Sequence, residues 1–184
     1  MLTKRLLMIV MVLIVLLLIT TPLTARANES LAIGGQLGFL ATGAVIDIPL
    51  GPIAIQAGVN YPLGIAYIDA IADLGGALTG LFDSIFVATA DVTFPISLGE
   101  NFDLKIGVST LAFTDFNTSA FGMLGPAIKG EYWIPNKNYG LYVHLNSPLM
   151  VYGVTEADGF MYEADPAIAL LGLFTTTAGV LWAL

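Results

Sequence analysis

Cysteine is absent from this chain, and charged residues are scarce. Without cysteine the protein has no disulfide framework, thiolate metal site, cysteine nucleophile or lipid-modified cysteine at a mature N-terminus. Charged residues make up 11% of the sequence, whereas soluble domains carry about 25%. Apolar residues make up 57%. Much of the surface is therefore expected to be apolar, and a membrane is the simplest environment for such a surface.

Basic residues are the scarcest charged group. There are six of them against fourteen acids, and Lys4, Arg5 and Arg26 all lie in the first 27 positions. Only three lysines remain beyond that point, together with all of the acids. This balance argues against binding to nucleic acid and against docking on an anionic lipid surface, because both need clustered Lys and Arg. The length of 184 residues fits a leader and one further domain.

Residues 1–27 have the three parts of a secretory signal peptide. A short basic end is followed by an apolar run from Leu6 to Ile19, and then by Ala25-Arg26-Ala27, which predicts cleavage after Ala27. The alternative is an uncleaved anchor, but the run is shorter than the roughly 20 residues that a spanning helix prefers. We therefore expect residues 28–184 to form the mature protein.

Beyond the leader, Gly, Pro and Asp interrupt every apolar run up to about residue 166. Short segments instead alternate apolar residues with small or polar ones, which is typical of strands with one greasy face. Only helices and closed barrels satisfy all backbone polar groups in lipid, so the pattern predicts an eight-stranded antiparallel transmembrane β-barrel. The expected strands are 31–40, 44–48, 53–60, 85–94, 102–109, 128–134, 139–146 and 167–184.

The connections between these segments alternate in length, with one exception, the short connection near Ala41 to Gly43. Short turns rich in Pro, Gly and Asn follow the second, fourth and sixth strands, whereas 61–84, 112–122 and 149–166 are long. Short turns on one side and long loops on the other are typical of outer-membrane barrels. The last segment is open to a second interpretation, because its eighteen uncharged residues also suit one membrane helix. Its Thr and Gly content favours a strand.

On these segments and turns, the mature chain resembles the small eight-stranded outer-membrane barrels, the class of the OmpA membrane domain, OmpX and OmpW. The resemblance implies a Gram-negative outer membrane, contact with its lipids, and insertion by the barrel assembly machinery. Members of this class commonly end in an aromatic residue, whereas this chain ends Trp182-Ala183-Leu184. A soluble, lipocalin-like barrel is the rival architecture, but it would need polar outer faces.

The alternation points a set of polar side chains into the lumen. An eight-stranded barrel is narrow enough for side chains to fill it, so we expect a packed network of ion pairs and hydrogen bonds in place of a pore. His144 is the only histidine and has no nucleophile motif beside it, so we predict no catalytic site, no metal site and no cofactor. The expected lumen residues are Asp47, Gln56, Asp91, Asp103, Lys105, Lys129, Glu131 and His144, with Asn146 beside them.

The long connection 61–84 has apolar residues at three- and four-residue steps, the period of an amphipathic helix. Two interpretations stay open: the helix caps the barrel mouth with its apolar face inward, or it borders an apolar entrance or lies in the membrane interface. In the second case, the resemblance to OmpW implies a small apolar ligand, and paired glycines at 75 and 76 suit a movable lid. The candidate lid or ligand residues are Ile68, Ile71, Leu74, Leu78, Leu81 and Phe82.

Acidic residues gather in the last long connection, around Gly159. Glu156, Asp158, Glu163 and Asp165 suit either a solvated acidic loop or a Ca²⁺ site, but their spacing matches no EF-hand. We therefore predict a non-enzymatic barrel with a structural or surface-interaction role. The alternative is a porin-like narrow channel or carrier for small hydrophobic compounds.

Overall fold

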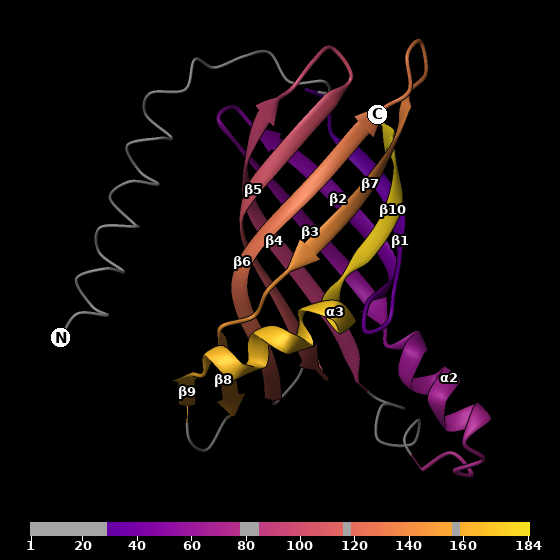
Figure 1. Cartoon of the computed structure of the whole chain (residues 1–184), viewed down its shortest axis with the longest axis vertical. Coiled ribbons are helices and arrows are strands. Elements are labelled where there is room, and N and C mark those ends of the chain that lie inside the picture. Colours follow the sequence, from indigo (N-terminus) through magenta and orange to yellow (C-terminus); the bar gives the residue numbers. More distant parts are fainter. Residues whose placement is uncertain (1–28, 78–84, 116–118, 156–158) are drawn as a thin grey trace, which may run out of the picture.

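The computed structural model describes residues 29–77, 85–115, 119–155 and 159–184, so the predicted leader lies outside the described residues. Eight antiparallel strands close a barrel, which confirms the expected all-β, eight-stranded architecture (Figure 1). These strands are β1 (Ala32–Gly38), β2 (Thr42–Leu50), β3 (Ile53–Tyr61), β4 (Phe86–Ser97), β5 (Phe102–Thr114), β6 (Ser119–Trp133), β7 (Tyr139–Asn146) and β10 (Thr177–Ala183).

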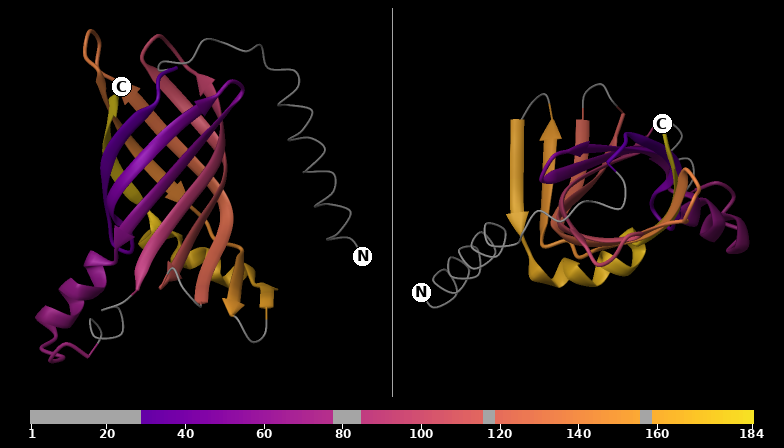
Figure 2. Two further views of the ribbon diagram at one scale, coloured as in Figure 1. Left: turned by 180° about the vertical axis from the view of Figure 1, so that it is seen from behind. Right: turned by 90° about the horizontal axis from the view of Figure 1, so that it is seen from above.

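The barrel closes where the first and last strands pair. Ala32 pairs with Ala183 and Gly38 with Thr177, which places β10 between β1 and β7. Closure matters because it leaves these eight strands without a free edge. The view along the axis shows the resulting ring, with the helices outside it (Figure 2).

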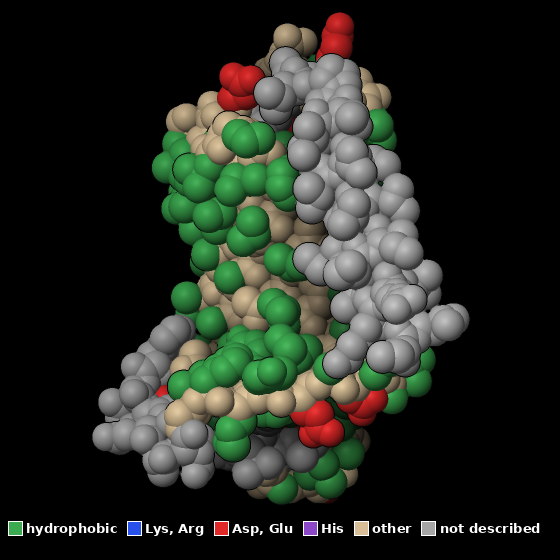
Figure 3. Space-filling model, turned by 90° about the vertical axis from the view of Figure 1, so that its left-hand side faces the viewer, with side chains coloured by type: hydrophobic (Ala, Val, Ile, Leu, Met, Phe, Trp, Pro, Cys, Tyr) green, Lys and Arg blue, Asp and Glu red, His purple; other side chains and the backbone are tan. Residues whose placement is uncertain are grey.

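Side chains along most of the wall alternate between the inside and the outside of the barrel. In β7, the side chains of Leu141, Val143 and Leu145 are 48–52% exposed, whereas those of His144 and Asn146 are 6% and 5% exposed. The period of two follows from the pleat of the strand. On the face shown in Figure 3, hydrophobic side chains are the main coloured groups along the wall, and acidic side chains lie at its two ends.

The two ends of the barrel differ. The turns joining β2 to β3, β4 to β5 and β6 to β7 are short and lie at the end that also holds the C-terminus (Figure 1). The opposite end carries helix α2 (Leu63–Ile71), the hairpin of β8 (Met150–Thr155) and β9 (Gly159–Ala164), the 3-10 helix η2 (Pro166–Leu171) and helix α3 (Gly172–Thr175). The expected segregation is present only in part. At this end, long connections join β3 to β4 and β7 to β10, whereas β1 to β2 and β5 to β6 are joined by short ones, at 39–41 and 115–118. The predicted long loop 112–122 is mostly strand, because β5 runs to Thr114 and β6 begins at Ser119.

The predicted strand 167–184 was too long. Residues 166–175 are helical, and the strand begins only at Thr177. The helical part has a local cause, because Pro166 suits a first helical turn and the Asp165 carboxylate accepts a hydrogen bond from the Ala167 backbone nitrogen. The predicted loop 149–166 also contains a hairpin, and β8 extends the sheet beside the far half of β6.

Helix α2 begins after Pro62, inside the stretch with the helical period, and ends at Ile71. Its one charged residue, Asp69, is 3% exposed, whereas Tyr67 and Ile71 are 65% and 66% exposed. The helix projects outward from the rim instead of crossing the mouth (Figure 2). Of the helices that the structure describes, none is long and apolar enough to span a membrane.

Strands β1 and β10, which pair to close the barrel, lie so close together that one added methyl group should lower the stability of the barrel. A Cβ atom added at Gly34 would collide with the carbonyl oxygen of Val180, in the facing strand β10, whereas one added at Gly153 meets nothing within 4 Å. Gly34→Ala should therefore force β1 and β10 apart and destabilise the barrel by about 1–3 kcal/mol. The midpoint of thermal unfolding in detergent measures this effect. Gly153→Ala is the control, and equal midpoints for the two variants would contradict the close pairing of β1 with β10.

Candidate functional site: the polar interior of the barrel

The interior holds all the polar residues that the alternation directs inward. Each of the eight predicted lumen residues is buried, and so is Asn146. Asp47 and Gln56 come from β2 and β3, Asp91 from β4, Asp103 and Lys105 from β5, Lys129 and Glu131 from β6, and His144 from β7. Every strand from β2 to β7 therefore contributes at least one of them.

Strand register arranges these residues in two rows. One row runs through cross-strand partners from Asp47 to Gln56, Asp91 and Ser109. The other runs from Lys105 to Lys129, His144 and Thr177. The first row carries two carboxylates and the second two ammonium groups, so the two rows can form ion pairs across the narrow lumen.

Four ion pairs join two lysines to two carboxylates. Lys105 Nζ lies 3.0 Å from Asp47 Oδ2 and 2.8 Å from Glu131 Oε2, and Lys129 Nζ lies 2.7 Å and 3.0 Å from the same two atoms. Because each lysine contacts both acids, the four groups form one ring of alternating charge. We call Asp47, Lys105, Lys129 and Glu131 the charge ring. Buried charges need such pairing, since desolvation of each ion costs several kcal/mol.

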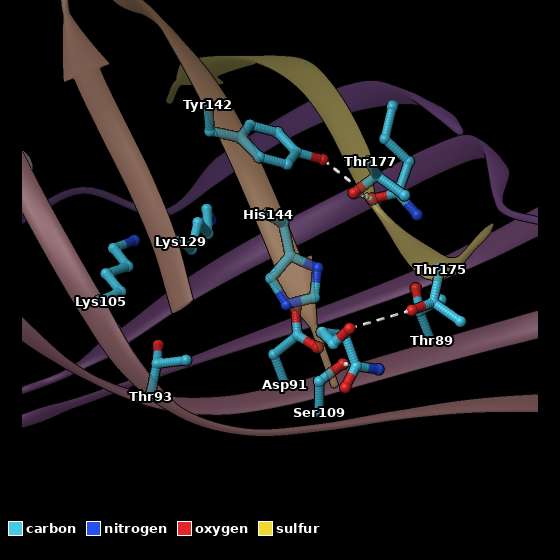
Figure 4. A network of polar contacts seen from close by, with 12 residues as sticks. Thr89, Asp91, Thr93, Lys105, Ser109, Lys129, Tyr142, His144, Thr175 and Thr177 are labelled. Atoms are coloured by element: carbon cyan, nitrogen blue, oxygen red, sulfur yellow. Dashed lines mark hydrogen bonds and ion pairs between the residues drawn. The ribbon is translucent and has the colours of Figure 1, made fainter. Parts of the chain in front are cut away.

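A second polar group lies beside the charge ring. His144 points its imidazole toward the carboxylate of Asp91, with 3.8 Å between Nε2 and Oδ2 (Figure 4). Asn146 Nδ2 donates to Ser109 Oγ over 3.4 Å. We call Asp91, Ser109, His144 and Asn146 the His144 group. Asp91 Oδ1, His144 Nε2 and Asn146 Oδ1 have no hydrogen-bond partner within the described part of the chain.

Gln56 connects the two clusters. With its side-chain amide oriented so that both ends have partners, its nitrogen donates to Asp91 Oδ2 over 3.3 Å and its oxygen accepts from Lys129 over 3.2 Å. A neutral amide between a buried acid and a buried lysine transmits part of the charge compensation from one cluster to the other. The polar interior therefore acts as one unit.

Three interior residues that were not among the predicted lumen residues extend the network around the wall. Tyr142 donates to Gln36 Oε1 over 2.9 Å, and Gln36 Nε2 donates to Asn60 Oδ1 over 2.8 Å. Lys129 also lies 4.6 Å from the centre of the Tyr142 ring, a cation–π distance. The alternation of apolar and polar residues puts all three on inward faces, so the sequence contained a signal by which they could have been predicted.

Apolar side chains pack above and below the polar layer. Trp133 and Leu181 lie in a buried cluster near the end with the short turns, and Leu111 and Met123 lie in another near the opposite end. Trp133 also donates from its indole to Glu131 Oε1 over 2.7 Å. The lumen is thus filled by side chains in three layers, apolar, polar and apolar.

The candidate lid residues lie outside the barrel. Ile68, Ile71 and Leu74 are exposed on α2 and the turn that follows it, while Leu78, Leu81 and Phe82 lie outside the described residues. An open apolar depression of about 620 Å³ lies between the base of α2 and the end of β1. It is lined by Gly38, Phe39, Leu63, Gly64, Ala66 and Tyr67.

The acidic connection is only partly described. Glu156 and Asp158 lie outside the described residues, Glu163 is exposed on β9, and Asp165 caps η2. Across the described ranges, no group of three or more His, Cys, Asp or Glu is placed to hold a metal ion. Comparisons with protein-family models, with curated proteins and with solved structures found no match for this chain.

The charge ring predicts a large cost for removing one lysine. Lys129→Met leaves two buried carboxylates with one shared cation, which should destabilise the barrel by about 3–5 kcal/mol. Lys137→Met is the matched control, because Lys137 is exposed in the turn between β6 and β7, and its loss should change stability by less than about 0.5 kcal/mol. Urea unfolding followed by tryptophan fluorescence measures both variants. Similar midpoints would show that the ring does not support the fold.

Proposed function

We propose that this protein is a non-enzymatic β-barrel of a Gram-negative-type outer membrane, with a structural or surface-interaction role. One observation carries the proposal: the barrel has charged residues inside and apolar residues outside. Asp47, Lys105, Lys129 and Glu131 are buried, while Ile33, Val59, Val108 and Val143 are 47–53% exposed on four different strands. Lipid-facing apolar residues and a polar lumen are the pattern of outer-membrane barrels.

A soluble barrel would have the reverse arrangement, with apolar residues inside and polar residues on its outer wall. Soluble monomers rarely expose contiguous apolar patches above a few hundred Å², because water penalises apolar area. Here large apolar side chains are exposed on each of β1, β3, β4, β5, β6, β7 and β10. Such a continuous apolar wall favours hydrocarbon over water as its surroundings. We therefore propose lipids of the outer membrane as its first partners.

The elements at the helical end suit a membrane interface. In α2 the acidic side chain is buried and the apolar side chains are exposed, and on η2 and α3 Leu170 and Leu173 are 80% and 84% exposed. Helices that expose apolar residues beside a lipid-facing wall are suited to lie at the boundary between head groups and acyl chains. The long connections would then face outward from the cell.

The filled interior supports a structural role over conduction. A ring of four ion pairs crosses the lumen, and apolar clusters pack on both sides of it. Solute passage would require these buried charges to separate, which costs several kcal/mol per ion. The predicted leader would export the chain, and the barrel assembly machinery would insert it.

The proposal is tested by locating the protein and assaying barrel closure. The full chain is expressed with its leader in a Gram-negative host, membranes are separated by density, and boiled and unboiled samples are compared on a gel. We expect an outer-membrane fraction and a mobility shift on boiling. Protein in the soluble or inner-membrane fraction, without a shift, would contradict the proposal.

A lysine on the outer wall distinguishes lipid from water as the surroundings. Val143 and Leu50 are 51% and 49% exposed, but Val143 lies halfway along its strand, whereas Leu50 ends β2. In a bilayer, Val143→Lys should cost about 2–4 kcal/mol and Leu50→Lys about 0–1 kcal/mol. Urea unfolding from liposomes measures both. Equal costs would indicate that water surrounds the wall.

The apolar depression beside α2 favours a second function, a carrier for small hydrophobic compounds. Its lining, which includes Phe39 and Tyr67, is almost wholly apolar. Uptake of a labelled apolar solute into liposomes containing the protein tests this function. The carrier requires uptake above empty liposomes, reduced several-fold by Ala66→Trp, which fills the depression. Uptake equal to that of empty liposomes would exclude it.

A further inference from the structure

We propose that the His144 group is a binding site for a divalent first-row transition-metal ion inside the barrel. The site is formed by the Asp91 carboxylate, the Asn146 amide oxygen and the His144 imidazole nitrogen, with the Ser109 hydroxyl beside them. Because it depends on the barrel interior alone, this inference goes beyond the proposed function and does not depend on where the barrel resides.

The charges of the interior are unevenly distributed. Four buried carboxylates, those of Asp47, Asp91, Asp103 and Glu131, share the interior with two buried lysines. Both lysines form ion pairs with Asp47 and Glu131, and Asp103 accepts from Ser97. Asp91 is 4% exposed and has no lysine in ion-pair range within the described residues. A buried carboxylate needs a cation or several hydrogen bonds.

The atoms around Asp91 satisfy it only in part, because Gln56 donates to its Oδ2 while its Oδ1 remains without a donor in the described part of the chain. Asp91 Oδ1 and Asn146 Oδ1 are hydrogen-bond acceptors, and neither has a donor within the described ranges. His144 Nε2 also has no partner there, and its 3.8 Å separation from Asp91 Oδ2 is too long for a hydrogen bond. The three residues are 4–6% exposed, so bulk water does not compensate them.

The placement of the four residues suits one shared ion. Asp91 and Ser109 are cross-strand partners on β4 and β5, and His144 and Asn146 are two residues apart on the same face of β7. The pair on β7 faces the other pair across the lumen. His144 Nε2 lies 3.8 Å from Asp91 Oδ2 (Figure 4), and the amide nitrogen of Asn146 lies 3.4 Å from Ser109 Oγ. Two ligand atoms 3.8 Å apart can both contact a metal ion at about 2.0–2.2 Å.

The types of ligand indicate the class of metal. A neutral imidazole suits Zn²⁺, Ni²⁺ or Fe²⁺, whereas Mg²⁺ and Ca²⁺ prefer oxygen ligands alone. One nitrogen with two or three oxygens therefore favours a first-row transition metal. Only one of the four residues carries a negative charge, so the expected affinity is moderate and should fall when His144 is protonated.

Titration with Zn²⁺ alone tests the site. Full-length mature barrel, treated with EDTA and dialysed in detergent, is titrated calorimetrically, and its thermal unfolding is followed with and without the ion. We expect saturable binding of one ion per chain and a higher unfolding midpoint. Mg²⁺ at the same concentration should leave the midpoint unchanged, and an equal response to Mg²⁺ would overturn the role of the imidazole.

Two variants and a control locate the binding. Asp91→Asn and His144→Gln keep side-chain size while removing a ligand, and each should weaken Zn²⁺ binding at least tenfold. Asp103→Asn is the matched control, a buried carboxyl outside the His144 group that should bind as the original protein does. Absence of saturable binding, or equal binding by all four proteins, would overturn the proposal. If one ligand variant fails to fold, the other still gives the comparison.

Discussion

The ion pairs inside the barrel are the interaction on which the rest of the structure depends. Beyond the predicted leader the chain has three lysines, and two of them lie in the charge ring with Asp47 and Glu131. Desolvating four ions is costly unless each ion contacts opposite charges at close range. The ring meets this condition, because each lysine contacts both acids. It therefore ties β2, β5 and β6 together through the centre of the barrel.

Burying the charges inside also determines the outer surface. A strand alternates its two faces, so each polar residue directed inward leaves its neighbours outside. With the polar residues of β2 to β7 directed inward, the apolar residues of the same strands make a continuous outer wall. The wall and the ring are thus two results of one sequence pattern. The proposed lipid surroundings follow from the wall, and the proposed lack of conduction follows from the ring.

The sequence predicts well which side chains point into the barrel, but it predicts poorly which of these side chains contact one another. The period of two assigned Asp47, Lys105, Lys129 and Glu131 to the inside, because alternation is local. Which of them meet depends on the stagger between paired strands, which places Lys129 beside His144 and opposite Asp47. That stagger follows from closure of β1 on β10 and is not encoded in any short segment.

The ends of the elements were also hard to predict. Residues 166–175 are apolar enough for a strand, yet Asp165 and Pro166 begin a helical turn there. Residues 112–122 were predicted as a loop, but β5 continues to Thr114 and β6 begins at Ser119, because neighbouring strands extend beside them. In the first place a local capping signal determined the secondary structure, and in the second a neighbouring strand did, in spite of what the spacing of apolar residues predicts.

The two tryptophans provide the most direct test of a barrel whose outer wall faces lipid and whose interior does not. Trp133 is buried in the lumen, and Trp182 is 46% exposed on the outer wall. Trp133→Phe and Trp182→Phe each leave one fluorophore, and both variants are reconstituted in liposomes of ordinary or brominated lipid. Bromine quenches indole fluorescence on contact. The account predicts strong quenching of Trp182 and little of Trp133, and equal quenching of the two, or none of Trp182, would contradict it.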